Sequence, residues 1–178
     1  MSAHSATTEE NAQKVEVIPA AKEHEPALDD LLQLYAQDFR EFHEIPLDEN
    51  GRFHYNPLPL YWSDPARHAF LVKVDDSVAG FIFVKRGSEV SGNQDVWDMA
   101  EFFVMREFRR QGIGTQIAHE IWRRFPGSWE VRVMEANTFA MEFWVNAITR
   151  LIGEGYLLTP FSKDSESWKL FSFESQKN

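Results

Sequence analysis

Apolar residues recur at helical spacing in three stretches of the chain. Over 26–42, leucine and aromatic side chains return every three or four positions, and aspartates occupy the first turn, where the helix dipole favours acids. Over 113–125, isoleucine returns every fourth residue. The third stretch, 138–151, follows Asn137, a residue type that caps helix N-termini well. The pattern predicts three amphipathic helices.

Segments rich in β-branched and aromatic residues, bounded by turn residues, predict the strands. A long stretch, 43–66, holds four prolines, and we expect a partly irregular loop there with a short helix near 58–62. The order is β-α-loop-β-β-β-α-β-α-β-β, which predicts a mixed α/β domain. The predicted strands are 15–18, 69–74, 78–85, 96–105, 129–134, 155–161 and 168–173.

Composition narrows the class of protein. The chain has 178 residues, 43% of them hydrophobic, which suits one folded domain. Its formal net charge of −10 disfavours a nucleic-acid-coating protein, and the absence of cysteine excludes disulfides and thiolate chemistry. No apolar run approaches the roughly 20 residues that span a bilayer. We expect a disordered tail at 1–14, a single domain at 15–178, no membrane partner and a cytoplasmic location.

The informative motif is a strand followed by an arginine-rich turn, two glycines and a helix. Gly112 and Gly114 leave backbone N–H groups uncovered at a helix N-terminus, where the first donors lack partners and the dipole attracts anions. Residues 106–124 carry five arginines and two glutamates, whereas the rest of the chain is strongly acidic. A positive segment in an acidic protein suggests one anionic ligand held at one place.

The two common nucleotide motifs do not fit this turn. A P-loop needs Lys and Ser/Thr after its second glycine, and a dinucleotide fingerprint needs a third glycine where Ile117 stands. Gly-x-Gly alone is equally consistent with an ordinary tight turn into a helix. A binder of nucleotide phosphates that uses this turn in another way stays open as the weakest of three hypotheses.

Here the chain resembles the GNAT superfamily of N-acetyltransferases. Its signature, Arg/Gln-x-x-Gly-x-Gly/Ala after a strand ending in Val, stands in this sequence as Arg109-Arg110-Gln111-Gly112-Ile113-Gly114 after Val104. The family's later Asn, Ala and aromatic positions match Asn137, Ala140 and Trp144. The order of elements agrees from about residue 15 to 174.

The resemblance implies a GNAT-like fold, with a mixed and mostly antiparallel sheet, and acetyl-CoA as the co-substrate. It implies that a bulge separates the strand before the motif from the next one and opens a slot for the thioester. The residues that the resemblance assigns to the co-substrate comprise the amides of the turn, a strand edge that pairs with pantetheine, and two positions at the next helix: Arg109, Arg110, Gln111, Gly112, Ile113, Gly114, Thr115, Phe103, Val104, Met105, Asn137 and Trp144. Asn137 can equally cap its own helix.

Acyl transfer to an amine needs a group that removes a proton, because primary amines are mostly protonated at neutral pH. Glu101 lies in an otherwise apolar run and is the first candidate for base or amine contact. Asp98 is the second candidate, and it faces the opposite side if the strand is regular. We therefore expect direct transfer in a ternary complex to the primary amine of a small molecule or peptide.

One position departs from the family pattern. Many members place a tyrosine at position 144, as an acid for the leaving thiolate, and this chain has Trp144, whose indole cannot deliver a proton. The thiolate leaves unassisted, or a nearby tyrosine or water assists it, or the protein is a non-catalytic acyl-CoA-binding or sensing module. Tyr156 is expected in the core.

The remaining side chains of interest have two interpretations each. His43, His54 and His68 lack metal-ligand spacing, so no metal site is expected, although the first two border the long loop. An aromatic set in that loop either forms a wall of the acceptor site or packs the loop against the domain. Its members are Phe53, Tyr55, Tyr61 and Trp62.

Overall fold

The computed structural model describes residues 12–176. Residues 1–11 of the expected N-terminal tail lie outside this range. At its edge, the backbone N–H of Lys14 donates to the Asp75 carboxylate, and the N–H of Asp75 donates to the Lys14 carbonyl.

The predicted order of helices and strands is confirmed, with boundaries shifted by a few residues. In chain order the elements are β1 (Val15–Pro19), η1 (Lys22–His24), α1 (Glu25–Phe39), α2 (Leu60–Ser63), β2 (Arg67–Val74), β3 (Ser77–Arg86), β4 (Trp97–Val104), η2 (Arg106–Phe108), α3 (Ile113–Arg124), β5 (Gly127–Met134), α4 (Thr138–Ile152), β6 (Leu157–Lys163) and β7 (Glu166–Ser175).

All seven strands form one mixed sheet in the order β1-β2-β3-β4-β5-β7-β6. Every neighbouring pair is antiparallel except β4 and β5. Two hairpins close through two-residue turns, Asp75-Asp76 and Asp164-Ser165, in which both residues have positive φ, as a type I′ turn requires. The mixed, mostly antiparallel sheet that the resemblance implies is therefore confirmed.

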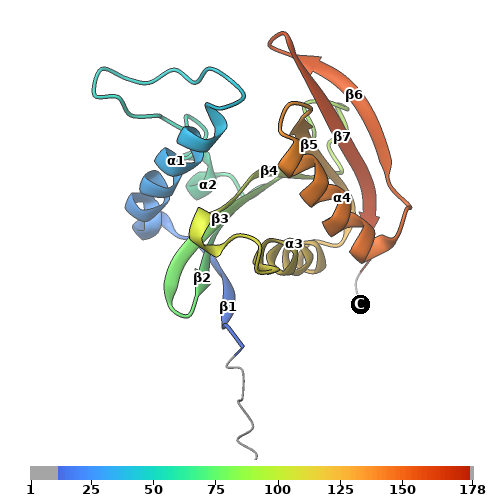
Figure 1. The fold of residues 1–178 in the computed structure, drawn as a ribbon, viewed down its shortest axis with the longest axis horizontal. Helices are drawn as coiled ribbons and strands as arrows, with labels where there is room; N and C mark the ends of the chain where they lie inside the picture. Colours follow the sequence, from blue (N-terminus) through green and yellow to red (C-terminus); the bar gives the residue numbers. More distant parts are fainter. Residues whose placement is uncertain (1–11, 177–178) are drawn as a thin grey trace, which may run out of the picture.

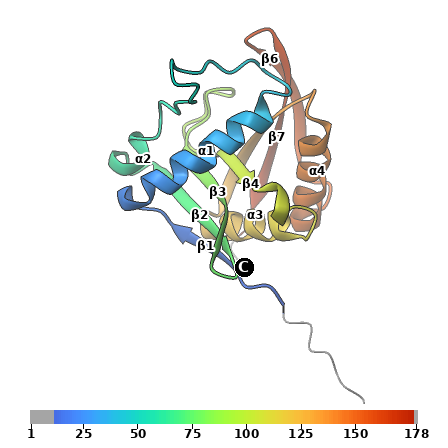
Figure 2. The same cartoon turned by 60° about the vertical axis from the view of Figure 1, so that its left-hand side comes forward.

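Helices cover both faces of the sheet. Helices α3 and α4 pack on one face, where Ile117, Trp122 and Trp144 join a large apolar core (Figure 1). Helix α1 crosses the other face over β2, β3 and β4, where its leucines meet Phe81 and Phe83 (Figure 2). The apolar stripes of the three predicted helices supply these contacts, and this arrangement leaves the ends of β4 and β5 between α1 and α4.

Candidate functional site

The two parallel strands at the centre of the sheet separate soon after they meet. Strands β4 and β5 pair only at Trp97–Trp129 and Asp98–Glu130. Just beyond, the β3–β4 register shifts, because Phe83 lies opposite Glu101 while Val84 lies opposite Met99. The extra residue, Ala100, forms a β-bulge, which bends a strand and ends pairing. We call the diverging segments, residues 99–104 of β4 and 131–134 of β5, the fork.

The bulge changes the direction of the side chains along β4. A regular strand would place Asp98 and Glu101 on opposite faces, which is the sequence-based expectation. Ala100 takes up one position, so both carboxylates face the α1 side, where Asp98 meets Arg132 and Glu101 meets Tyr35. The expected opposition of the two side chains is therefore wrong for this strand.

Glu101 lies partly exposed on the α1 face at the fork. It accepts a short hydrogen bond from the Tyr35 hydroxyl on α1, and the Tyr55 hydroxyl of the long loop faces it. Burial raises the pKa of Glu101, against the hydrogen bond from Tyr35 and the positive charge of Arg132. Burial and the neighbouring carboxylate raise the pKa of Tyr35, so its hydroxyl remains a donor. A carboxylate with a raised pKa is suited to accept a proton near neutral pH.

Asp98 occupies a different environment. It is 2% exposed and pairs with Arg132 at 3.1 Å and with Lys85 at 3.8 Å. Burial raises its pKa, while the two cations lower it. The structure brings Asp98 to the same face as Glu101 but buries it beneath the fork, where a bound amine would not reach it.

The glycine turn presents main-chain donors that the protein leaves free. Arg110 and Gly112 have φ of +60° and +79°, and the first helical bond of α3 runs from the Gln116 N–H to the Gly112 carbonyl. The six amides of residues 110–115 donate to no other group within residues 12–176. The Arg109 amide is an exception to the expected set, because it donates to the Arg106 carbonyl. Six free amides at a helix N-terminus form a site suited to a diphosphate.

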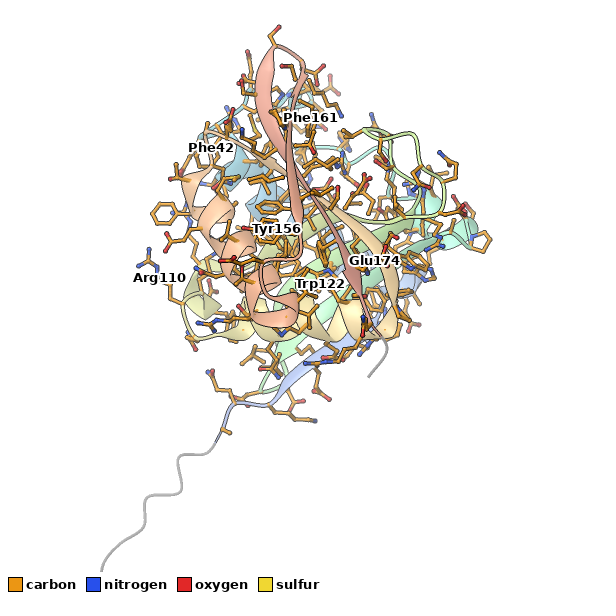
Figure 3. All side chains as sticks on the ribbon, turned by 90° about the vertical axis from the view of Figure 1, so that its right-hand side faces the viewer. Phe42, Arg110, Trp122, Tyr156, Phe161 and Glu174 are labelled. Carbon is orange, nitrogen blue, oxygen red and sulfur yellow. The ribbon has the colours of Figure 1, made fainter. Side chains whose placement is uncertain are left out.

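The arginines of this turn have different roles. Arg109 donates from Nε to the Val104 carbonyl at 2.6 Å and from Nη2 to Asp38 at 2.5 Å, so it braces the turn against β4 and α1. Arg106 reaches the same aspartate at 2.7 Å. The exposed Arg110 lies over the Phe139 ring, and its side chain projects from the body of the domain in Figure 3. Of the three, Arg110 is the one free to meet an anion.

The strand edge at the fork differs by one residue from the expected one. The Met105 N–H donates to Ala79 of β3, and a Cβ on Gly80 would lie 2.0 Å from the Phe103 carbonyl oxygen. In an antiparallel ladder, alternate residues direct both polar main-chain groups to the same neighbour. Phe103 and Met105 therefore face β3, and Phe102 and Val104 face the fork. Of the three expected positions, only Val104 lies on the open edge.

Asn137 and Trp144, which the resemblance assigns to the co-substrate, make contacts within the protein at the start of α4 and along it. The Asn137 side chain accepts from the Ala140 N–H at 3.1 Å, which is the capping role. Trp144 is 6% exposed, and its ring lies 4.9 Å from that of Phe102 and 4.8 Å from that of Phe143. Its indole thus fills the space between α4 and the edge of β4.

The long loop contributes to the α1 face. Tyr61 is buried against Phe83, whereas Tyr55 also packs on Phe83 but directs its hydroxyl toward Glu101. Within the aromatic set of the loop, Tyr61 therefore packs the loop against the domain, and Tyr55 contributes to the site. Across the fork, Phe39 of α1 approaches Trp168 of β7, with ring centroids 6.4 Å apart.

The histidines do not gather into a site. His54 pairs with Asp48 at 2.6 Å, His43 lies 3.9 Å from Glu166, and His68 packs on Phe125. No group of three metal-binding side chains occurs within residues 12–176. In the same part of the chain, no helix has the length and apolar character needed to cross a membrane.

Three residues of the site were missed by the sequence reasoning. Tyr35 belongs to an amphipathic stripe that is typical of a core, and its contact with Glu101 spans 66 positions. Arg132 lies between the buried Val131 and Val133 on β5, whereas neither chain neighbour of Trp168 on β7 is buried. The alternation itself was a usable signal, because a charged residue in the middle of a central strand needs a partner.

Comparisons with known proteins concern the family and the fold in which this site lies. Residues 28–146 match the model of the acetyltransferase (GNAT) family. A search of curated proteins finds no match. An acetyltransferase from Thermus thermophilus is 18% identical, with a TM-score of 0.65 over 90% of this chain and 97% of that one.

Two further solved structures have acetyl-CoA bound. A GNAT family acetyltransferase from Elizabethkingia anophelis is 14% identical, with a TM-score of 0.58 over 90% of this chain and 97% of that one. NAA60 from Arabidopsis thaliana is 12% identical, with a TM-score of 0.62 over 90% and 98%. At these identities the likeness concerns the fold.

Proposed function

The chain belongs to the GNAT acetyltransferase family, and from that premise we propose that it transfers the acetyl group of acetyl-CoA to a primary amine, with Glu101 as the base. The amine belongs to a small molecule or a peptide and reacts directly within a ternary complex. The observation that carries the proposal is Glu101 itself, a partly exposed carboxylate at the mouth of the fork whose pKa is raised by burial.

The residues present fit acetyl-CoA. The six free amides of residues 110–115 match the oxygens of a diphosphate, and Arg110 adds a free positive charge beside them. The main-chain groups of Phe102 and Val104 offer an open strand edge to the amides of an extended arm, although the Val104 carbonyl is already bonded to Arg109. When bound there, acetyl-CoA supplies an activated acyl group.

The chain's own residues then handle the proton. Tyr35 fixes the Glu101 carboxylate through its hydroxyl, and Tyr55 faces the same group. Glu101 accepts a proton from the amine on the α1 face, so that the nitrogen lone pair is available to form the amide bond. Trp144, buried in the packing between α4 and β4, takes no proton-transfer role, and the thiolate leaves without a side-chain acid.

Thiol release measured with a panel of amines tests the proposal. The panel contains 2-phenylethylamine, spermidine and a peptide with a free N-terminal alanine. We expect acetyl-CoA to bind and at least one amine to release CoA, and Glu101→Gln to lower kcat about 100-fold with little change in the KM for acetyl-CoA. The exposed Glu89→Gln is the matched control and should retain full activity. Binding without release by any amine would select the non-catalytic acyl-CoA-binding module that the missing tyrosine at position 144 suggests.

A further inference from the structure

Three buried polar atoms beneath the fork lack hydrogen-bond partners within residues 12–176. They are Oδ1 of Asp98, Oε2 of Glu130 and Nε of Arg132. Asp98 and Glu130 are 2% and 5% exposed. The register places these two residues opposite each other on β4 and β5, and Arg132 comes two positions further along the same face of β5. Neighbouring residues on one face of β4 and β5 thus carry two unsatisfied acceptors and one unsatisfied donor.

The chemistry of these atoms selects what can lie between them. Leaving a buried polar group unpaired destabilises the fold, so such atoms in native proteins are normally satisfied by protein groups or by ordered water. A water molecule donates two hydrogen bonds and accepts others, which matches two carboxylate oxygens and one guanidinium N–H. An anion would be repelled by Asp98 and Glu130, and a metal ion would meet the charges of Arg132 and Lys85.

The same residues lie between Glu101 and a groove at the other end of the strands. Asp98 is the next carboxylate after Glu101 on the α1 face of β4. Glu130 borders a groove of about 700 Å³ at the far end of β5 and β7. Trp122 and Glu174, both labelled in Figure 3, line this groove as well. Unsatisfied polar atoms therefore extend from the acceptor face toward an open surface on the side away from the glycine turn.

We propose that Asp98, Glu130 and Arg132 hold ordered water beneath the fork, and that this water carries the proton taken up by Glu101 out to the groove. The inference rests on the proposed function for the source of the proton. Asp98 and Glu130 act through the water and touch neither the amine nor the thioester, so they are positioning residues.

The step balances without any further reactant. With acetyl-CoA bound, the protonated amine would give one proton to Glu101, and the freed lone pair would bond the acyl carbon. As the C–S bond breaks, the second proton would pass from the nitrogen to the departing sulfur, which is released as the thiol. Glu101 then passes the proton to the nearest water, the water beside Asp98 and Glu130 passes a proton to the groove, and Glu101 returns to its carboxylate form. The raised pKa of Asp98, caused mainly by burial, favours acceptance of a hydrogen bond or a proton from this water.

The charged and titratable groups around this route come from several elements. Tyr35 of α1 and Tyr55 of the long loop face Glu101. Lys85 of β3 lies 3.8 Å from Asp98 and also binds the exposed Glu89 of the following loop at 2.7 Å. A variant at Glu89 therefore removes a nearby negative charge without removing a buried acceptor.

A crystal structure of the full chain, without any acceptor, tests the first half of the proposal. We expect at least one water within about 3.2 Å of Asp98 Oδ1, Glu130 Oε2 and Arg132 Nε. A structure in which these atoms bond directly to protein groups, with no water between them, would overturn the proposal whatever the enzyme's activity.

Kinetics of Glu130→Gln test the second half, with the most active amine of the panel. This substitution keeps the shape of the side chain but replaces a charged acceptor. We expect kcat to fall about tenfold, less than the roughly 100-fold loss from removing the base, with KM values unchanged and activity partly restored by added imidazole. Glu89→Gln should show neither the loss nor the restoration.

Failure of the proton route and failure of the proposed function give different results. Unchanged kcat in Glu130→Gln, or a loss that imidazole does not restore, would overturn the proton route while Glu101→Gln still shows its own loss. Full activity of Glu101→Gln would instead overturn the role of Glu101 in the proposed function, and with it the source of the proton, even if the crystal structure contains the water.

Discussion

The hydroxyl of Tyr35 on α1 donates a hydrogen bond to the carboxylate of Glu101 on β4. This contact joins the helix on one face of the sheet to the strand at which the sheet opens. Because Tyr35 also packs its ring against Phe81 and Phe103, the hydroxyl is held in place by the core. The position of α1 therefore fixes the orientation of the proposed base.

Tyr35→Phe removes this hydrogen bond while keeping the ring. The hydrogen bond lowers the pKa of Glu101, so its loss raises that pKa further. A base is active when deprotonated, and activity falls as pH drops through its pKa. We therefore expect the acidic limb of the kcat/KM profile to move to higher pH, measured by thiol release across a pH series. Tyr156→Phe, whose ring packs on Phe171 away from the fork, should leave the limb in place. If the acidic limb of the Tyr35→Phe profile does not move, the hydrogen bond from Tyr35 does not set the pKa of the base.

Substitutions at Gly112 separate backbone strain from loss of binding. Its φ is +79°, and a Cβ there would meet no atom within 4 Å. Gly112→Ala should therefore cost about 1–2 kcal/mol of unfolding free energy from the left-handed conformation alone. Gly112→Glu adds a carboxylate beside the free amides, and we expect its dissociation constant for acetyl-CoA, measured by calorimetry, to rise at least about 100-fold above that of Gly112→Ala. Equal affinities of the two variants would argue against this location for the diphosphate.

Asp38→Asn should lower stability in a pH-dependent way. Partial burial raises the pKa of Asp38, but hydrogen bonds from Arg109 and Arg106 outweigh it and hold the pKa below its usual value. The stabilisation is present above the unfolded-state pKa, about 4, and is lost as pH falls through the lower folded value. Because both arginines are more than one-third exposed, we expect a loss of about 1 kcal/mol at pH 7 in urea unfolding.

Urea unfolding of Asp38→Asn near pH 3 separates the effect of charge from that of packing. There, Asp38→Asn and the parent chain should differ much less, because Asp38 itself begins to be protonated. Asp30→Asn is a suitable control, since its side chain is 82% exposed and lies 3.8 Å from Arg52. An equal loss at both pH values would show that the effect comes from packing and not from charge.

Trp144→Phe tests whether the departure from the family pattern affects chemistry. The indole fills space beside Phe102 and Phe143, so the smaller ring should cost about 2 kcal/mol of unfolding free energy. Turnover should stay within about threefold, because neither side chain can deliver a proton. If the folded variant loses its activity in the thiol-release assay, the indole takes part in the transfer.

Local sequence patterns were sufficient for most of the fold. The isoleucine repeat from Ile113 and the double-aspartate turn at Asp75-Asp76 each depend on neighbours in the chain, and both elements form where expected. The glycine turn was also predictable, since a free helix N-terminus depends on the backbone of a few consecutive residues. Its free amides at residues 110–115 agree with that expectation.

The parts that were not predicted depend on distant partners. The resemblance implied a bulge in this strand, but its position was not predictable, because the extra residue Ala100 emerges only in the pairing of β4 with β3 and nothing in the run around Glu101 signals it. That single residue brings Asp98 to the face of Glu101 and shifts the open strand edge from Phe103 to Phe102. Tyr35 and Arg132 approach Glu101 and Asp98 only after α1 and β5 have packed.

The two-rung contact between β4 and β5 also has a thermodynamic consequence. Past Asp98 and Glu130, β4 and β5 no longer pair with each other. An extended ligand lying in the fork would therefore bond to strand edges that have no partner strand. Ligand affinity and the cohesion of the two half-sheets would then be one coupled equilibrium. A saturating concentration of co-substrate should slow amide hydrogen exchange along both β4 and β5, including at amides that the ligand does not contact.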